Sequence, residues 1–94
     1  MNEFSNLGQY LKQKRMSSDL TQGELAEKLG DVHVQFVSNW ERGLCAPPNH
    51  CLEKLIQTLD LSREKLVKVM LEDSKIIITA KIFKKSNSAK RSLG

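Results

Sequence analysis

Residues 20–43 read LTQGELAEKLGDVHVQFVSNWERG, and this stretch decides the fold. Thr21 and Glu24, three residues apart, form the pattern of a capping box, which begins a helix. Gly30 indicates the end of that helix, because glycine adopts the left-handed conformation without strain. A second helix is predicted over about 32–43. The stretch therefore predicts two short helices joined by a turn.

One face of the second of these helices is not required for packing in the core. Val37 and Trp40 lie three residues apart and are predicted to point inward. At about 100° per residue, the outward positions are Gln35, Ser38, Asn39 and Arg42. This outward face is polar but nearly uncharged, whereas an ordinary solvated helix usually carries lysine and glutamate there. The pattern therefore favours a binding surface over a face that only meets water.

Apolar residues at helical spacing predict three more helices around this pair. The first, over about residues 5–16, is marked by Phe4, Leu7, Tyr10 and Leu11. Asn49 is predicted to cap the fourth helix and Ser62 the fifth. The apolar stripe of the fifth helix is Leu66, Val69 and Met70. The predicted core consists of Leu7, Leu25, Leu29, Val37, Trp40, Leu55 and Leu59.

Residues 75–83 are compatible with two conformations. The run 76–78 consists of β-branched isoleucines, which favours a strand. Val69, Ile76 and Phe83 are spaced by seven residues, which favours a continuation of the fifth helix. The helix is favoured, and the strand stays open as an alternative.

The length of the chain, 94 residues, allows one small domain or one domain with a tail. We expect an all-α, five-helix domain at 1–71, an apolar C-terminal extension at 72–85 and a basic, flexible tail at 86–94. We expect no separate ligand-sensing domain within 94 residues. The apolar share of 39% and the charged share of 28% fit a soluble globular protein. No run approaches the roughly 18 apolar residues of a membrane span, and the first residues lack the basic start of a secretion signal.

The reactive side chains argue against catalysis and against a metal site. Cys45 and Cys51 are expected to be reduced, as in a cytosolic protein. His50 beside Cys51 supplies too few ligands for a metal. No glycine-rich phosphate loop is present, and neighbours on a helix point about 100° apart, so His50 is not placed to activate Cys51. We therefore expect no enzymatic activity, no metal and no cofactor.

The surplus of positive charge lies in the C-terminal quarter of the chain. Residues 1–71 contain 9 Lys/Arg and 9 Asp/Glu, whereas residues 72–94 contain 6 Lys/Arg and 2 Asp/Glu, so 6 − 2 accounts for the net charge of +4. A basic tail either keeps the protein soluble or contacts phosphates and strengthens non-specific DNA binding. Both interpretations stay open.

Five short motifs together resemble one family of proteins. They are Leu20-Thr21-Gln22, Glu24-Leu25-Ala26, Leu29-Gly30, Val37-Ser38 and Trp40-Glu41-Arg42-Gly43. The combination resembles the helix-turn-helix family of phage repressors and Cro proteins, the XRE family, over about residues 5–71. Nine residues separate Gly30 from Trp40, where the family commonly has eight, and we place the extra residue near Asp31 and Val32. The resemblance implies a lambda-repressor-like domain whose second motif helix enters the DNA major groove.

The resemblance also implies contacts at the start of each motif helix. Thr21 and Gln22 begin the first one, where the glutamine of the family typically binds a phosphate and a helix N-terminus attracts anions. His33 and Val34 lie near the groove-facing start of the second one, where Val34 suits a thymine methyl group. Gln35 matches a position that reads bases, and a glutamine can bond adenine N6 and N7 together.

Further contacts are implied along the second motif helix. Asn39 matches a position that contacts adenine or a phosphate, and Ser38 shares its outward face. Arg42 either reaches a phosphate or interacts with the C-terminal dipole of its own helix. Phe36 falls at the edge of this face, where we expect half-buried packing and not a wedge between bases.

Arg15 and Glu41 match a pair that tends to form a salt bridge in the family. The bridge would connect the first helix of the domain to the second motif helix and so fix the orientation of that second helix. The alternative is two independent surface charges worth less than about 1 kcal/mol together.

The residues and the resemblance together predict a sequence-specific transcriptional regulator that binds double-stranded DNA. We expect a repressor that binds as a homodimer through the helix around 33–42, with two copies about 34 Å apart on a palindromic site. Surplus apolar surface predicts a dimer interface within 66–83 that consists of Leu66, Val69, Met70, Ile76, Ile77 and Phe83. The alternatives are that this segment folds onto its own core, or that the protein is an antitoxin or another protein-binding regulator whose C-terminal tail holds a protein partner. We expect a cytoplasmic protein, associated with the nucleoid when bound to DNA, with no membrane partner.

Overall fold

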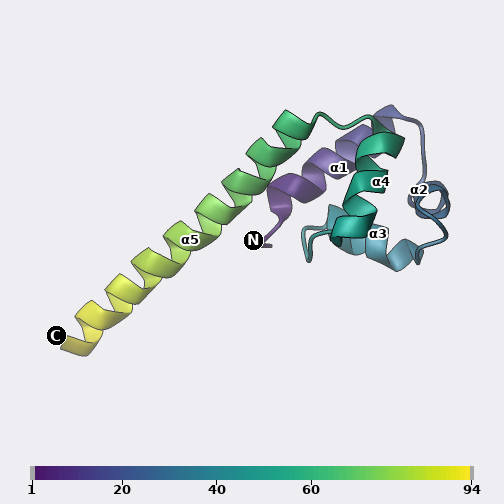
Figure 1. The fold of residues 1–94 in the computed structure, drawn as a ribbon. Coiled ribbons are helices and arrows are strands. Elements are labelled where there is room, and N and C mark those ends of the chain that lie inside the picture. The colour runs from purple at the N-terminus through teal and green to yellow at the C-terminus, as the bar shows by residue number, and fades with distance from the viewer. Residues whose placement is uncertain (1, 94) are drawn as a thin grey trace.

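The computed structural model describes the backbone of residues 2–93 and the side chains of residues 2–83. It contains the helices α1 (Ser5–Ser17), α2 (Gln22–Lys28), α3 (Val34–Glu41), α4 (Asn49–Leu59) and α5 (Arg63–Leu93). This part of the chain has no strand, so the expected all-α, five-helix fold is confirmed. Residues 75–83 are helical, as the seven-residue spacing predicted, and belong to the long α5 that leaves the domain in Figure 1.

The two ends of α2 are set by local interactions. The N–H of Glu24 donates to Thr21 Oγ1 at 3.0 Å and the N–H of Thr21 donates to Glu24 Oε1 at 2.8 Å, which is the predicted capping box. The N–H of Thr21 also holds the pKa of the Glu24 carboxyl below its ordinary value, because it stabilises the charged form. After α2, Gly30 and Asp31 both have positive φ, 94° and 59°. These two left-handed residues reverse the chain in the turn where we place the extra residue.

The starts of α4 and α5 differ in their capping. Asn49 is the first residue of α4 and not its cap, so that prediction was wrong by one residue. The cap is Pro48, whose extended conformation (φ −64°, ψ 158°) leads directly into the helix. Ser62 lies before α5 as predicted, and its Oγ accepts the N–H of Lys65 at 3.1 Å.

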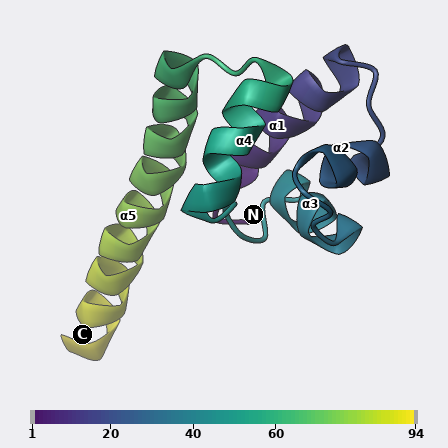
Figure 2. The ribbon, with the colours of Figure 1, turned by 45° about the vertical axis from the view of Figure 1, so that its right-hand side comes forward.

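The core lies between α1–α4 and the first turns of α5, which runs along one side of the domain in Figure 2. All seven predicted core residues are buried. Further buried apolar residues are Tyr10, Leu11, Ala26, Cys51, Leu61 and Leu66. The Tyr10 hydroxyl accepts the N–H of Ser62 at 3.2 Å, so α1 also holds the start of α5.

Only the first part of α5 packs on the domain. Leu66 is buried, and Val69 and Met70 pack against the core. The first three residues of the predicted dimer interface, Leu66, Val69 and Met70, therefore pack onto the core of their own domain. For these three residues the alternative interpretation is confirmed. The rest of α5 projects, and the principal extents of the molecule are 55 × 26 × 22 Å. The basic tail expected at 86–94 lies outside the residues whose side chains are described.

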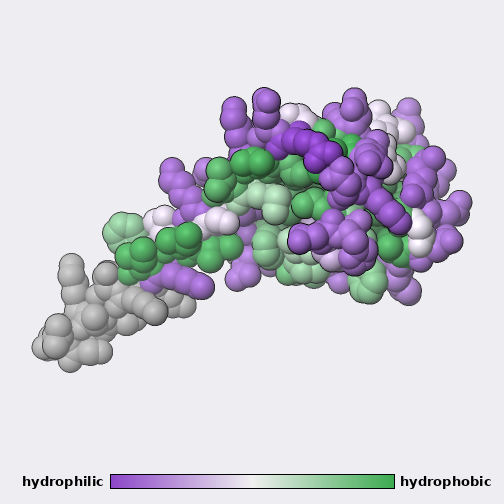
Figure 3. All heavy atoms as spheres, viewed as in Figure 1, coloured by the Kyte–Doolittle hydropathy of each residue, from purple (hydrophilic) through white to green (hydrophobic). Residues whose placement is uncertain are grey.

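Apolar surface remains exposed on the projecting part of α5. Figure 3 shows hydrophobic side chains along this helix where it leaves the domain. The large exposed apolar residues of α5 are Val67, Leu71, Ile76, Ile78, Ile82 and Phe83. Within the described residues, no helix has the length and apolar character that crossing a membrane requires.

Candidate nucleic-acid interface

α3 buries one face and presents the other to solvent. Val37 and Trp40 are buried, as predicted. The residues on the opposite side are His33, Val34, Gln35 and Arg42, which are exposed, with Ser38 and Asn39 half-buried. The outward face inferred from the sequence is therefore the accessible face of the helix.

Three side chains of this face are joined by hydrogen bonds. Gln35 Nε2 and Arg42 Nη2 each donate to Asn39 Oδ1, both at 3.0 Å. By count, Gln35 keeps its carbonyl oxygen and one N–H for a ligand, and Asn39 keeps its N–H donors. Gln35 can thus present a donor and an acceptor together to a base edge, while Asn39 and Arg42 can donate to bases or phosphate oxygens.

An imidazole caps the N-terminus of α3. His33 Nδ1 accepts the N–H of Gln35 at 3.2 Å, which requires Nδ1 to be unprotonated. The Phe36 ring lies beside the His33 ring, with centroids 6.1 Å apart. Phe36 is 54% exposed, which is more than the half-buried packing predicted for it implies.

Two further apolar side chains lie exposed at the ends of α3. Val34, the first residue of α3, is 44% exposed, so its methyl groups are accessible. Leu44, just after the helix, is 48% exposed and was not among the predicted contact residues. The only sequence signal for Leu44 is an apolar residue directly after the turn glycine, and such a residue is more often buried.

Glu41 is buried at the C-terminal end of α3 and paired on both oxygens. Arg15 Nε lies 2.5 Å from Glu41 Oε2 and Arg15 Nη2 lies 3.0 Å from Oε1, which makes a bidentate salt bridge. The two side chains are only 11% and 3% exposed. Arg15 Nη1 also donates to the carbonyl oxygen of Leu20 at 2.7 Å. The pair expected from the resemblance thus ties α1 to α3 and to the start of the α2 segment.

Gln22 joins the same network. Its Nε2 donates to Glu41 Oε1 at 3.0 Å, and its side chain is half-buried. The Thr21 hydroxyl is used as an acceptor in the capping box. Both residues lie at the start of α2, where the resemblance implies a phosphate contact, and each retains a hydrogen that can be donated to one.

The backbone of α1 touches the C-terminal end of α3. A Cβ added to Gly8 would lie 2.6 Å from the carbonyl oxygens of Trp40 and Glu41, so only glycine fits there. The N–H of Phe4 donates to the carbonyl oxygen of Gly43 at 3.1 Å, and Gly43 has a positive φ of 75°. The first turns of α1 and the end of α3 are therefore in direct backbone contact.

The side chains that the structure describes include no cluster of three or more His, Cys, Asp or Glu able to hold a metal ion. Cys45 is exposed and Cys51 is buried, and both are free thiols. They line a hollow of about 320 Å³ together with Phe36 and Trp40.

Two short helices joined by a tight turn, with a polar face on the second, define a helix-turn-helix protein. A family model described as helix-turn-helix matches residues 11–66. The chain therefore belongs to the XRE family of helix-turn-helix DNA-binding proteins.

Among solved structures, the chain is similar to the clp gene regulator ClgR from Corynebacterium glutamicum. The sequence identity is 22%, the TM-score is 0.61, and the alignment covers 98% of this chain and 95% of that one. At this identity the likeness concerns the fold, and it extends over α5. No curated protein matches the chain in sequence.

Proposed function

We propose that the protein is a transcriptional regulator that binds double-stranded DNA sequence-specifically, with α3 in the major groove. The observation that carries the proposal is the accessible chain of Gln35, Asn39 and Arg42 along α3. A helix fits the major groove, where each base pair presents its own pattern of donors and acceptors. Membership of a helix-turn-helix family supports the same function.

In this proposal, the first turn of α3 reads the bases. Gln35 is the main reader, because its free oxygen and N–H match the N6 and N7 positions of adenine. Val34 contacts a thymine methyl group, and His33 and Ser38 lie beside these two contacts. The hydrogen bond from Gln35 to Asn39 holds the reading amide in place before DNA arrives.

Other residues hold the protein on the DNA backbone. Arg42, beside Asn39 and at the end of α3, contacts a phosphate. Thr21 and Gln22 contact a second phosphate from the start of α2. Contacts of this kind set orientation and register and carry no sequence information directly. Substitutions at Thr21, Gln22 and Arg42 should therefore weaken binding without altering the preferred sequence.

Replacing Gln35 by alanine is expected to weaken binding at the preferred site by roughly 1–3 kcal/mol and to relax the preference at one base pair. The measurement is a fluorescence titration on the preferred sequence and on scrambled DNA. Gln57→Ala removes an exposed glutamine of α4 instead and is the matched control. Equal losses on both DNA molecules would show that Gln35 does not read a base.

We further propose that the protein acts as a dimer and as a repressor. A single α3 contacts only a few base pairs, so two copies on a palindromic site are needed for useful affinity. The exposed apolar side chains of projecting α5 support an interface there. Occupation of a promoter by such a dimer excludes polymerase, which a reporter placed behind the selected site would detect as lower expression in the presence of the protein.

Removing residues 86–94, which include Lys90 and Arg91, is expected to weaken binding and to flatten the dependence of log affinity on log salt. If both charges meet phosphates, the slope changes by at most about 1.8, because each contact contributes about 0.9. Sequence preference should stay the same. Replacing Lys90 and Arg91 by glutamine keeps the length of the chain, so this variant separates the effect of the lost charge from the effect of the lost residues. A salt slope equal to that of the intact chain would leave the tail as a solubility segment.

A further inference from the structure

Asp73 of α5 holds the N-terminus of α1. Its Oδ1 accepts the N–H of Asn6 at 3.0 Å and its Oδ2 accepts the N–H of Leu7 at 2.9 Å. Asp73 is only 4% exposed. The residue at the N-cap position of α1, Phe4, makes no side-chain hydrogen bond to the helix. The cap of α1 therefore comes from a different helix, and a carboxylate is well suited to it because the N-terminal N–H groups carry partial positive charge.

Asp73 lies where α5 leaves the domain. Among the described side chains of α5, the inward-facing row runs through Leu66, Val69, Met70, Asp73 and Ile77, and Asp73 is the last buried member. The residues of 74–83 are exposed, apart from half-buried Ile77. The aliphatic contacts before Asp73 are non-directional, whereas its two hydrogen bonds fix both distance and direction.

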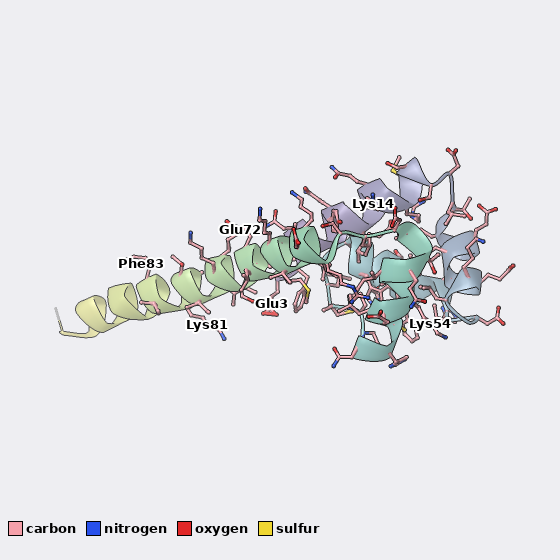
Figure 4. All side chains as sticks on the ribbon, turned by 45° about the horizontal axis from the view of Figure 1, so that its top comes forward. Glu3, Lys14, Lys54, Glu72, Lys81 and Phe83 are labelled. Carbon is pink, nitrogen blue, oxygen red and sulfur yellow. The ribbon has the colours of Figure 1, made fainter. Side chains whose placement is uncertain are left out.

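The N-terminal segment continues along α5 beyond Asp73. A hollow of about 340 Å³ at this junction is lined by Asn2 and Glu3 on one side and by Asp73, Ile76 and Lys81 on the other. Figure 4 shows Glu3 and Lys81 on the same side of α5. Asn2 Nδ2 in turn donates to the carbonyl oxygen of Arg42 at 2.8 Å, so residues 2–8 lie between α5 and the end of α3.

These contacts connect α5 to α3 through the first turn of α1. Asp73 holds the first turn of α1, and that turn is in backbone contact with the end of α3 through Gly8 and the hydrogen bond from Phe4 to Gly43. From Asp73 to Phe83, α5 extends about 15 Å at 1.5 Å per residue. A tilt of about 10° at Asp73 moves the far end by about 3 Å, close to the rise of one base pair.

We propose that Asp73 is a positioning residue: it fixes the angle between projecting α5 and α3, and thereby sets the spacing between the two DNA half-sites. The inference rests on the dimer through α5 proposed above. Asp73 itself touches neither the DNA nor the partner copy. It makes the dimer bind DNA with one half-site spacing much more tightly than DNA whose spacing is one base pair longer or shorter.

The test uses Asp73→Asn, which keeps the size of the side chain but has one acceptor oxygen for two N–H groups. Glu72→Gln, the same chemical change at the adjacent exposed residue, is the matched control. The full-length variants are titrated against one half-site and against palindromes whose half-sites are moved apart one base pair at a time. Wild type and Glu72→Gln should favour one spacing over the next by about tenfold, and Asp73→Asn by about threefold or less. Affinity for the single half-site should change by less than about twofold.

A second variant removes part of the same contact from the side of α1. Asn6→Pro removes one of the two N–H donors, leaves Asp73 in place, and is tolerated in the first turn of a helix. It should broaden the spacing preference like Asp73→Asn, and it decides the question if Asp73→Asn does not fold. A folded variant that keeps the sharp spacing of wild type would overturn the inference. Wild-type protein without any preferred spacing would overturn the proposed dimer and this inference with it.

Discussion

Replacing Glu41 by alanine is expected to lower the free energy of unfolding by about 3–5 kcal/mol. The change leaves the Arg15 guanidinium, only 11% exposed, without its carboxylate partner. It also removes the acceptor of Gln22 where three helices meet. Arg15→Ala should cost a comparable amount, because it leaves a buried carboxylate unpaired, and the double variant should lose less than the sum. Urea and thermal melts followed by circular dichroism measure all four proteins.

The protein contains a matched control for this cycle. Arg63 Nη2 and Glu53 Oε1 are also 2.5 Å apart, but these side chains are 64% and 52% exposed. The same pair of substitutions there should show little coupling, since solvent screens exposed charges. Strict additivity at Arg15 and Glu41 would contradict the conclusion that this bridge holds α3 on α1.

Replacing both Ile77 and Phe83 by aspartate is expected to yield a folded monomer that binds the palindromic site about 100-fold more weakly or worse. Phe83 is 65% exposed on projecting α5, and Ile77 borders the hollow at the junction with the N-terminal segment. A second copy packed there would bury each new charge without a partner, which is costly. Affinity for one half-site should be kept, because α3 is untouched. Sedimentation and DNA titration provide the two readouts.

Aspartate at Gln13 of α1 and Gln57 of α4 supplies the control, because both are exposed polar positions outside α5. This pair of substitutions adds the same charge and should leave the dimer intact. Intact protein that is monomeric at tens of micromolar, and still monomeric on its preferred DNA, would contradict the dimer. The apolar surface of α5 would then belong to a different protein partner, as in the antitoxin alternative.

Local structure and the core were predictable because their signals are short-range. The capping box of Thr21 and Glu24 and the helix end at Gly30 depend on residues within one turn, and the structure contains both. The seven core residues follow from helical spacing alone. Residues 75–83 were ambiguous because isoleucines favour strands locally, and the helical continuation of α5 overrides that preference.

Contacts between distant residues had no such signal. Asp73 and Asn6 are 67 positions apart, and an aspartate in the middle of a polar stretch reads as a solvated charge. The hydrogen bonds of Gln35 and Arg42 to Asn39 differ from these, because residues four and three positions apart on a helix are neighbours. Their spacing allowed the contacts, but it did not indicate that both use one oxygen of Asn39. The bridge between Arg15 and Glu41 was expected only through the family resemblance. The helical phase of Phe36 predicted half-buried packing. It did not indicate that the Phe36 ring lies beside His33, the residue that caps α3.

We propose above that α3 reads DNA sequence as part of a symmetric dimer. Selection of bound sequences from a random pool of double-stranded DNA tests it most directly, because one experiment reports binding, symmetry and spacing. We expect an enriched inverted repeat with half-site centres about one helical turn, roughly 10 base pairs, apart. The same selection with Gln35→Ala should lose preference at one position in each half-site. A pool without any enriched sequence, or an enriched site that Gln35→Ala leaves unchanged, would show that α3 does not read DNA sequence through Gln35.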